Sequence, residues 1–154
     1  MEQQHTPVHL VDTAPSLPTP AAQGFDLDSV QDAGMAEYEV THPVTGAGTG
    51  AIFLLAGPEH PERKRITLSL IRRMRADAMR AQGKGKATDP EADIEEGRDM
   101  LVKATLGWRG VCKAGQPVPF SPQAAAQLYA DPKTQWLTKQ LLAAMNDQDL
   151  FIKA

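Results

Sequence analysis

Cysteine and histidine are the residues of this chain best suited to nucleophilic chemistry or metal binding. There is one cysteine, Cys112, and the four histidines lie in the N-terminal segment or beside prolines: His5, His9, His42 and His60. No histidine pair is spaced along one face of an expected helix, and no histidine stands in a catalytic signature with the cysteine. We therefore expect Cys112 to be an ordinary packed residue, and we expect the protein to bind no metal and no cofactor.

A pair of acids and a run of alternating glycines are two other patterns that could support chemistry. Glu95 and Asp99 are four residues apart, so both carboxylates lie on one face of an expected helix, as a pair of catalytic acids would. They belong to an acidic run, and no nucleophile, base and orienting group can be named beside them. Gly46, Gly48 and Gly50 alternate, but the lysine and the following helix of a phosphate-binding loop are missing. The sequence therefore predicts a protein that is not an enzyme and binds no nucleotide.

The elements that would position a binding site follow from composition. The chain has 154 residues, of which 42% are hydrophobic and 5% aromatic, so aliphatic side chains must fill most of one modest core. The first 33 residues contain four prolines and too little apolar surface to offset the entropy of ordering. We expect residues 1–33 to form a disordered arm and residues 34–154 to form a single domain.

Charge and hydropathy limit the partners. The formal net charge is -3, so there is no overall basic excess to hold nucleic acid. The N-terminus lacks the basic and apolar regions of a signal peptide, and the longest apolar run, 51–56, is too short to cross a bilayer. We expect a cytosolic protein with no membrane partner.

Hydrophobic periodicity indicates an α+β fold that is mostly helical. Period-two alternation over residues 36–40 and a short apolar run over 51–55, joined by a turn rich in glycine, predict an antiparallel β-hairpin. Beyond Gly57 the period changes to that of helices. Capping residues and prolines then delimit four helices, at about residues 62–82, 89–106, 123–129 and 133–146.

The first two helices differ in charge. The segment 62–82 carries seven cations against two acids, whereas the segment that follows Thr88 begins with an acidic run. A short linker rich in glycine and lysine joins them, so we expect an antiparallel helical hairpin with complementary outer faces. After the hairpin, Trp108 and Phe120 are the expected structural anchors of a compact linker over residues 107–120.

Three stretches resemble, in their order, a family of tail assembly chaperones from tailed phages. The first joins residues 42–46, the following strand and residues 57–59; the second comprises residues 108–110 and 115–121; the third is 130–151. These segments are similar to an "hPxTG" opening, a "W-x-G…G-x-P-x-P-F-S" knot and a "Trp-Leu-x-x-Gln" helix. Glu59-His60 departs from the family's acid-Ser pair. Together the stretches cover about residues 38–151.

The resemblance implies a non-catalytic assembly factor that acts in the host cytoplasm. Its partner would be the hydrophobic helices of the tape measure protein, with the tail tube protein as a second partner. A structural component of the virion, in the tail or connector, is the alternative. Nucleic-acid binding through the basic helix 62–82 is less favoured, and self-association stays open.

We expect the partner to bind chiefly the C-terminal region 121–151. This region has more apolar side chains than one buried stripe needs, and the adjacent pair Leu141 and Leu142 cannot point the same way on a helix. The expected partner-binding residues are Leu128, Trp136, Leu137, Leu141, Leu142, Met145 and Phe151.

Overall fold

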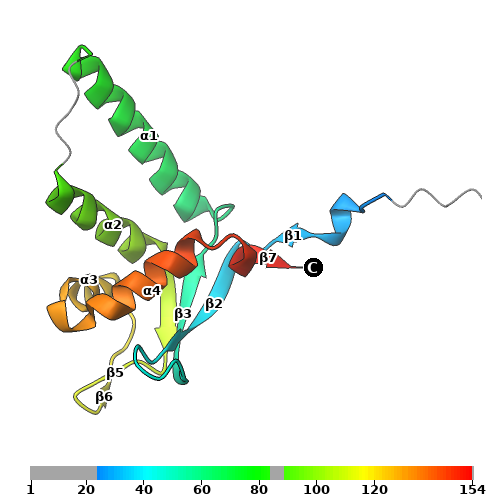
Figure 1. Cartoon of the computed structure of the whole chain (residues 1–154), viewed down its shortest axis with the longest axis vertical. Coiled ribbons are helices and arrows are strands. Elements are labelled where there is room, and N and C mark those ends of the chain that lie inside the picture. The colour runs from blue at the N-terminus through cyan, green and yellow to red at the C-terminus, as the bar shows by residue number, and fades with distance from the viewer. Residues whose placement is uncertain (1–23, 84–88, 154) are drawn as a thin grey trace, which may run out of the picture.

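The computed structural model describes residues 24–83 and 89–153, which form an α+β fold (Figure 1). Its helices are α1 (Pro61–Ala81), α2 (Pro90–Ala104), α3 (Pro122–Ala130) and α4 (Gln135–Asn146), with 3-10 helices at η1 (Leu27–Ser29), η2 (Pro132–Thr134) and η3 (Asp149–Phe151). Its strands are β1 (Gln31–Asp32), β2 (Met35–Thr41), β3 (Gly48–Ala56), β4 (Thr105–Arg109), β5 (Cys112–Lys113), β6 (Gln116–Pro117) and β7 (Ile152–Lys153). The predicted fold class is confirmed.

The main sheet has three antiparallel strands in the order β2–β3–β4. Tyr38 on β2 pairs with Phe53 on β3, which in turn pairs with Trp108 on β4. The predicted hairpin is therefore confirmed. The third strand of the sheet, β4, is not predicted by the sequence, which places residues 105–109 at the end of a helix and in a linker. A five-residue strand directly after a helix has too short a period-two pattern to be recognised.

The core lies where α2, α3 and α4 pack against this sheet (Figure 1). Its largest fully buried side chains come from these helices, from β2 and β3, and from η3: Tyr129, Phe53, Phe151, Leu55, Leu101, Leu141, Met145 and Val40. Gln140 on α4 also bonds the backbone of Thr41, donating to its carbonyl at 3.0 Å and accepting from its N–H at 3.2 Å. The Gln140 side chain thus provides hydrogen-bond partners for backbone groups at the end of β2, which is an edge strand of the sheet.

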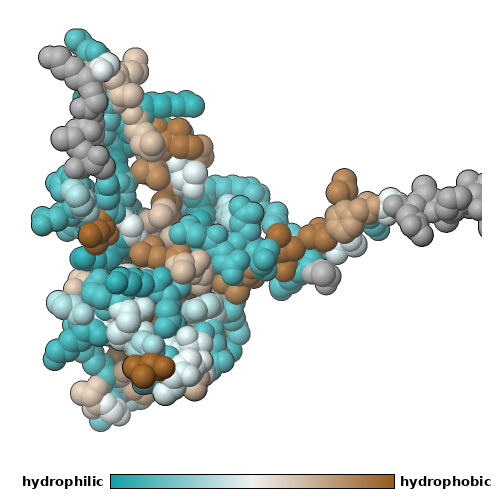
Figure 2. Space-filling view, viewed as in Figure 1, coloured by the Kyte–Doolittle hydropathy of each residue, from teal (hydrophilic) through white to brown (hydrophobic). Residues whose placement is uncertain are grey.

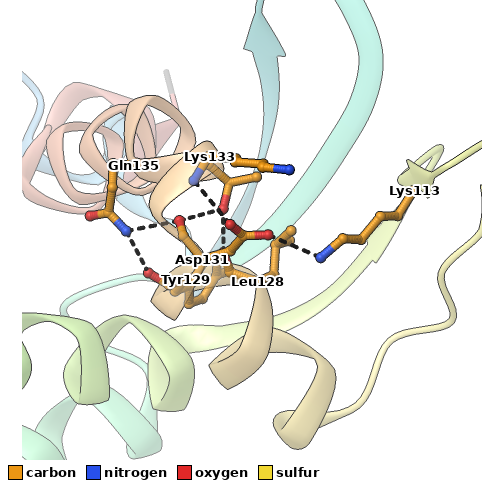
Figure 3. Close-up of polar contacts among 7 residues, drawn as sticks. Lys113, Leu128, Tyr129, Asp131, Lys133 and Gln135 are labelled. Carbon is orange, nitrogen blue, oxygen red and sulfur yellow. Dashed lines mark hydrogen bonds and ion pairs between the residues drawn. The ribbon is translucent and has the colours of Figure 1, made fainter.

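The joint between α3 and α4 is held by polar contacts around Asp131 (Figure 3). The Asp131 carboxylate accepts from the N–H of Lys133 at 2.9 Å and from the Lys113 ammonium at 3.0 Å. Gln135 donates to the carbonyls of Tyr129 and Asp131 at 3.2 and 3.0 Å. The carbonyls at the end of α3, which have no partner within the helix, are satisfied in this way.

The short strands β1 and β7, which lie near the two ends of the described chain, pair antiparallel. Ala33 is buried and donates its N–H to the Phe151 carbonyl at 2.6 Å, and the Gly57 N–H donates to Gly34 at 2.9 Å. A Cβ on Gly57 would lie 2.7 Å from the Ala33 carbonyl oxygen, so only glycine fits there. Residues 31–33 of the expected arm therefore belong to the fold. Residues 1–23 of that arm lie outside the described part of the chain.

The helix α1 leaves the body at its N-terminal end and diverges from α2 (Figure 1). His60 caps it by accepting from the Glu62 N–H at 3.2 Å, and Pro61 occupies its first turn. The Arg63 guanidinium donates to the carbonyls of Ala56 at 3.3 Å and Met145 at 3.2 Å, which ties α1 to β3 and α4. Partial burial at this position lowers the pKa of Arg63.

Two features bear on the expectations for chemistry and location. Cys112 is exposed, so the expectation that it is packed is wrong. It lies in β5, which pairs only with the equally short β6, and neither strand contributes a residue to the buried core. Within the described ranges 24–83 and 89–153, no helix combines the length and the apolar character that a membrane crossing requires.

Candidate partner-binding groove

The C-terminal residues expected to bind a partner lie mostly inside the protein. Four of them are buried, with exposed fractions of 6% or less: Leu137, Leu141, Met145 and Phe151. Leu128 and Leu142 are half-buried against the core, and Trp136 is exposed at 36%. The adjacent leucines are both accommodated because α4 has packing neighbours on more than one side, including α2, α3 and β2. This region therefore supplies packing for the core, and only Trp136 of the expected set faces solvent substantially.

The two expected structural anchors pack against the core and against each other. The ring of Trp108 lies 5.5 Å from that of Phe53 and 5.0 Å from that of Phe120, the latter in an edge-to-face arrangement. The Trp108 indole N–H donates to the Val118 carbonyl at 2.7 Å. Both residues are half-buried, and they hold the segment after β4 onto the sheet.

Exposed apolar side chains lie on the hairpin formed by α1 and α2, and a second group lies along the segment around β1 (Figure 2). None of the 21 residues of α1, all of which the structure describes, is buried. Met74 is 62% exposed and Met79 is 81% exposed, and Ile94 on α2 is 58% exposed. A helix with an apolar stripe normally packs that stripe against another element, so this hairpin has an incomplete interior.

A groove runs between α1 and α2. Its larger part has a volume of about 890 Å³, and a smaller part of about 270 Å³ adjoins it, with residues of both helices lining each part. The α1 wall presents an apolar row at helical spacing, whose members are Ile66, Leu70, Met74, Ala78 and Ala81. The α2 wall presents four acids, which are Asp93, Glu95, Glu96 and Asp99, and Lys103 lines its smaller part. Asp77 of α1 also lines the groove.

The two walls are joined by an ion pair between Arg73 on α1 and Glu96 on α2. The carboxylates of Asp93, Glu95 and Asp99 have no hydrogen-bond or ion-pair partner among residues 24–83 and 89–153. The groove therefore has an apolar wall and, facing it, an acidic wall that is only partly neutralised.

The sequence predicted the hairpin but not the groove. The pattern of Ile66, Leu70, Met74 and Ala78 was recognised as an apolar stripe, and the charges of the two helices suggested contact along their length. In the structure the helices diverge, so the stripe faces a hollow and not a packed neighbour. Periodicity shows which face of a helix is apolar, but it does not show what covers that face.

No group of three His, Cys, Asp or Glu side chains within the described part of the chain is arranged to hold a metal ion. Glu95 and Asp99, which the spacing placed on one helix face, line the groove without a nucleophile beside them. The arrangement is suited to binding, because an apolar wall of helical length faces a wall of carboxylates. No protein-family model, curated protein or solved structure matches this chain.

Proposed function

We propose that this protein is a non-catalytic binding protein that holds a partner's helix in the groove between α1 and α2. The observation that carries the proposal is the unburied apolar row of α1, which faces a groove instead of a core. Helix-in-groove recognition uses anchors at this spacing on both partners. The chemistry is that of association, with no bond made or broken.

Energetics favour an occupied groove. Most of the stability of a helix in a protein comes from packing its apolar face, and α1 packs little of it. Burying one exposed Leu or Met side chain contributes roughly 1.5–3 kcal/mol. A helix that covers Leu70 and Met74 would therefore gain affinity and stabilise α1 at the same time.

The resemblance to tail assembly chaperones supports the identity of the partner. In that interpretation the client is a hydrophobic helix of a tape measure protein, held in the host cytoplasm during tail assembly. We place the client on the hairpin and not on residues 121–151, because most of the apolar side chains expected to bind it are buried in the core.

Nucleic-acid binding by α1 has less support. Four of its seven cations have partners in the fold: Arg63 bonds carbonyls, Lys64 pairs with Glu59, Arg65 pairs with Glu62, and Arg73 pairs with Glu96. Strong binding to phosphates requires several cations that can release counterions together. Of the seven cations of α1, only Arg72, Arg75 and Arg80 are without a partner in the described part of the chain.

Co-expression with a tape measure protein tests the proposal. We expect soluble recovery of that client to depend on this chain. Leu70→Gln with Met74→Gln should abolish the rescue, because both side chains line the groove and glutamine keeps the helix propensity without adding charge.

The matched control is Leu68→Gln with Met79→Gln on the same helix. These side chains are exposed but do not line the groove, so this variant should rescue the client as well as the original chain. A client that stays soluble without this protein, or equal rescue by both variants, would refute the proposal. Stoichiometric recovery of the chain in finished particles would favour the virion-component alternative instead.

A further inference from the structure

Most of the charged side chains that line the groove are acids of α2. Asp93, Glu95 and Asp99 line it from α2 and have no partner in the described part of the chain. On α1, Arg65, Arg72, Arg75 and Arg80 do not line the groove, and Arg73 is paired with Glu96. A molecule in the groove therefore meets the apolar row of α1, beside which Arg73 and Asp77 also lie, and the carboxylates of α2. Lys103 of α2 lines the smaller part of the groove.

We infer that the groove selects amphipathic helices that carry lysine or arginine along one flank of their apolar face. This inference rests on the proposed helix-binding function and adds the charge of the client. A helix whose apolar face covers Leu70 and Met74 places one flank beside Glu95 and Asp99. Cations on that flank gain ion pairs, whereas acids there face like charges without compensation.

Spacing supports an elongated, helical occupant. Glu95 and Asp99 are one helical turn apart, and so are Leu70 and Met74 on the opposite wall. Both walls thus repeat with the period of a helix lying along them. Each exposed ion pair changes affinity by up to about fivefold, so two pairs give a preference of up to about 25-fold.

The test uses twin amphipathic peptides of the length of α1, with identical Leu and Ala faces. One twin carries Lys along one flank and the other carries Glu at the same positions. Calorimetry with the full chain should show the Lys twin binding more tightly than the Glu twin, by between about twofold and about 25-fold. Added salt should reduce that preference, because the deciding carboxylates are exposed. Glu95→Lys with Asp99→Lys should reverse the order of the two peptides.

Two controls separate site-specific binding from general attraction. Asp28→Lys with Asp32→Lys makes the same change in net charge at exposed positions away from the groove, and it should leave the preference intact. A Lys peptide with the same composition in scrambled order should not bind, because it has no continuous apolar face. Circular dichroism should show that every variant keeps its helices.

The outcomes distinguish this inference from the function on which it rests. If the twins bind equally, the groove holds helices without selecting charge, and the inference is wrong while the proposed function stands. If neither twin binds, both the inference and the proposed function are refuted. If the chain alone forms dimers that Glu95→Lys with Asp99→Lys disrupts, then the occupant is α1 of a second copy, and the inference about a foreign client is overturned.

Discussion

The buried hydroxyl pair between α3 and β4 permits a quantitative test of the core. The Tyr129 and Thr105 oxygens lie 2.8 Å apart, and the Thr105 hydroxyl also lies 2.7 Å from the Leu101 carbonyl. A threonine hydroxyl has one proton, and a carbonyl can only accept. Thr105 therefore donates to Leu101, and Tyr129 donates to Thr105.

This assignment predicts unequal effects of removing each partner. Tyr129→Phe leaves Thr105 bonded to Leu101 and should lower the free energy of unfolding by about 1 kcal/mol. Thr105→Val leaves the Tyr129 hydroxyl buried without its acceptor and should cost about 1–3 kcal/mol. The double variant has no orphaned group at this pair, so its cost should be smaller than the sum by at least about 0.5 kcal/mol.

Urea unfolding of the four proteins, followed by circular dichroism, measures these differences. Burial raises the pKa of Tyr129 above its ordinary value of 10.0. As the pH rises through 10.0, the unfolded chain releases this proton before the folded chain does, so the stability falls. Tyr129→Phe should lack that part of the alkaline loss. Additive costs, or a larger cost for Tyr129→Phe than for Thr105→Val, would refute the assigned direction of the bond.

Two further predictions concern glycine packing and a helix cap. Gly57→Ala should lower the free energy of unfolding by about 1–3 kcal/mol, because its Cβ would lie 2.7 Å from the Ala33 carbonyl oxygen and 2.8 Å from the Phe151 ring; an unchanged melting temperature would contradict this. Bonds from the Lys133 N–H and the Lys113 ammonium lower the pKa of Asp131 below 3.8, so its contribution is present above that pH and is lost as the pH falls through its folded pKa. Asp131→Ala should therefore lower the melting temperature at neutral pH, and its difference from the original chain should close in acid; a constant difference would count against the cap.

Local patterns were enough to predict most of the elements. The two strands of the hairpin follow from alternation and from a short apolar run. The start of α1 follows from Pro61, and the starts of α2 and α3 follow from a capping residue placed before a proline. Such signals act over a few residues, so they can be recognised without knowing the rest of the chain. The third strand, β4, escaped because its partner β3 lies some 50 residues away in the sequence, and pairing at that distance leaves little local trace.

The candidate site shows the same division. Leu137, Leu141, Met145 and Phe151 were recognised as apolar, yet the sequence did not show that other elements cover them. Leu70 and Met74 belong to an equally ordinary apolar stripe, which the structure leaves facing a groove. Burial depends on which elements meet, and residues distant in the sequence decide that.

The sequence by itself therefore determined the element types, the faces of the helices, and the opposite charges of α1 and α2, since each depends on neighbouring residues alone. Only the tertiary structure decided which apolar face is filled and which is open. Arg63 ties the base of α1 to β3 and α4, while the rest of α1 diverges from α2. That divergence, a property of packing and not of periodicity, places an apolar row opposite an acidic one.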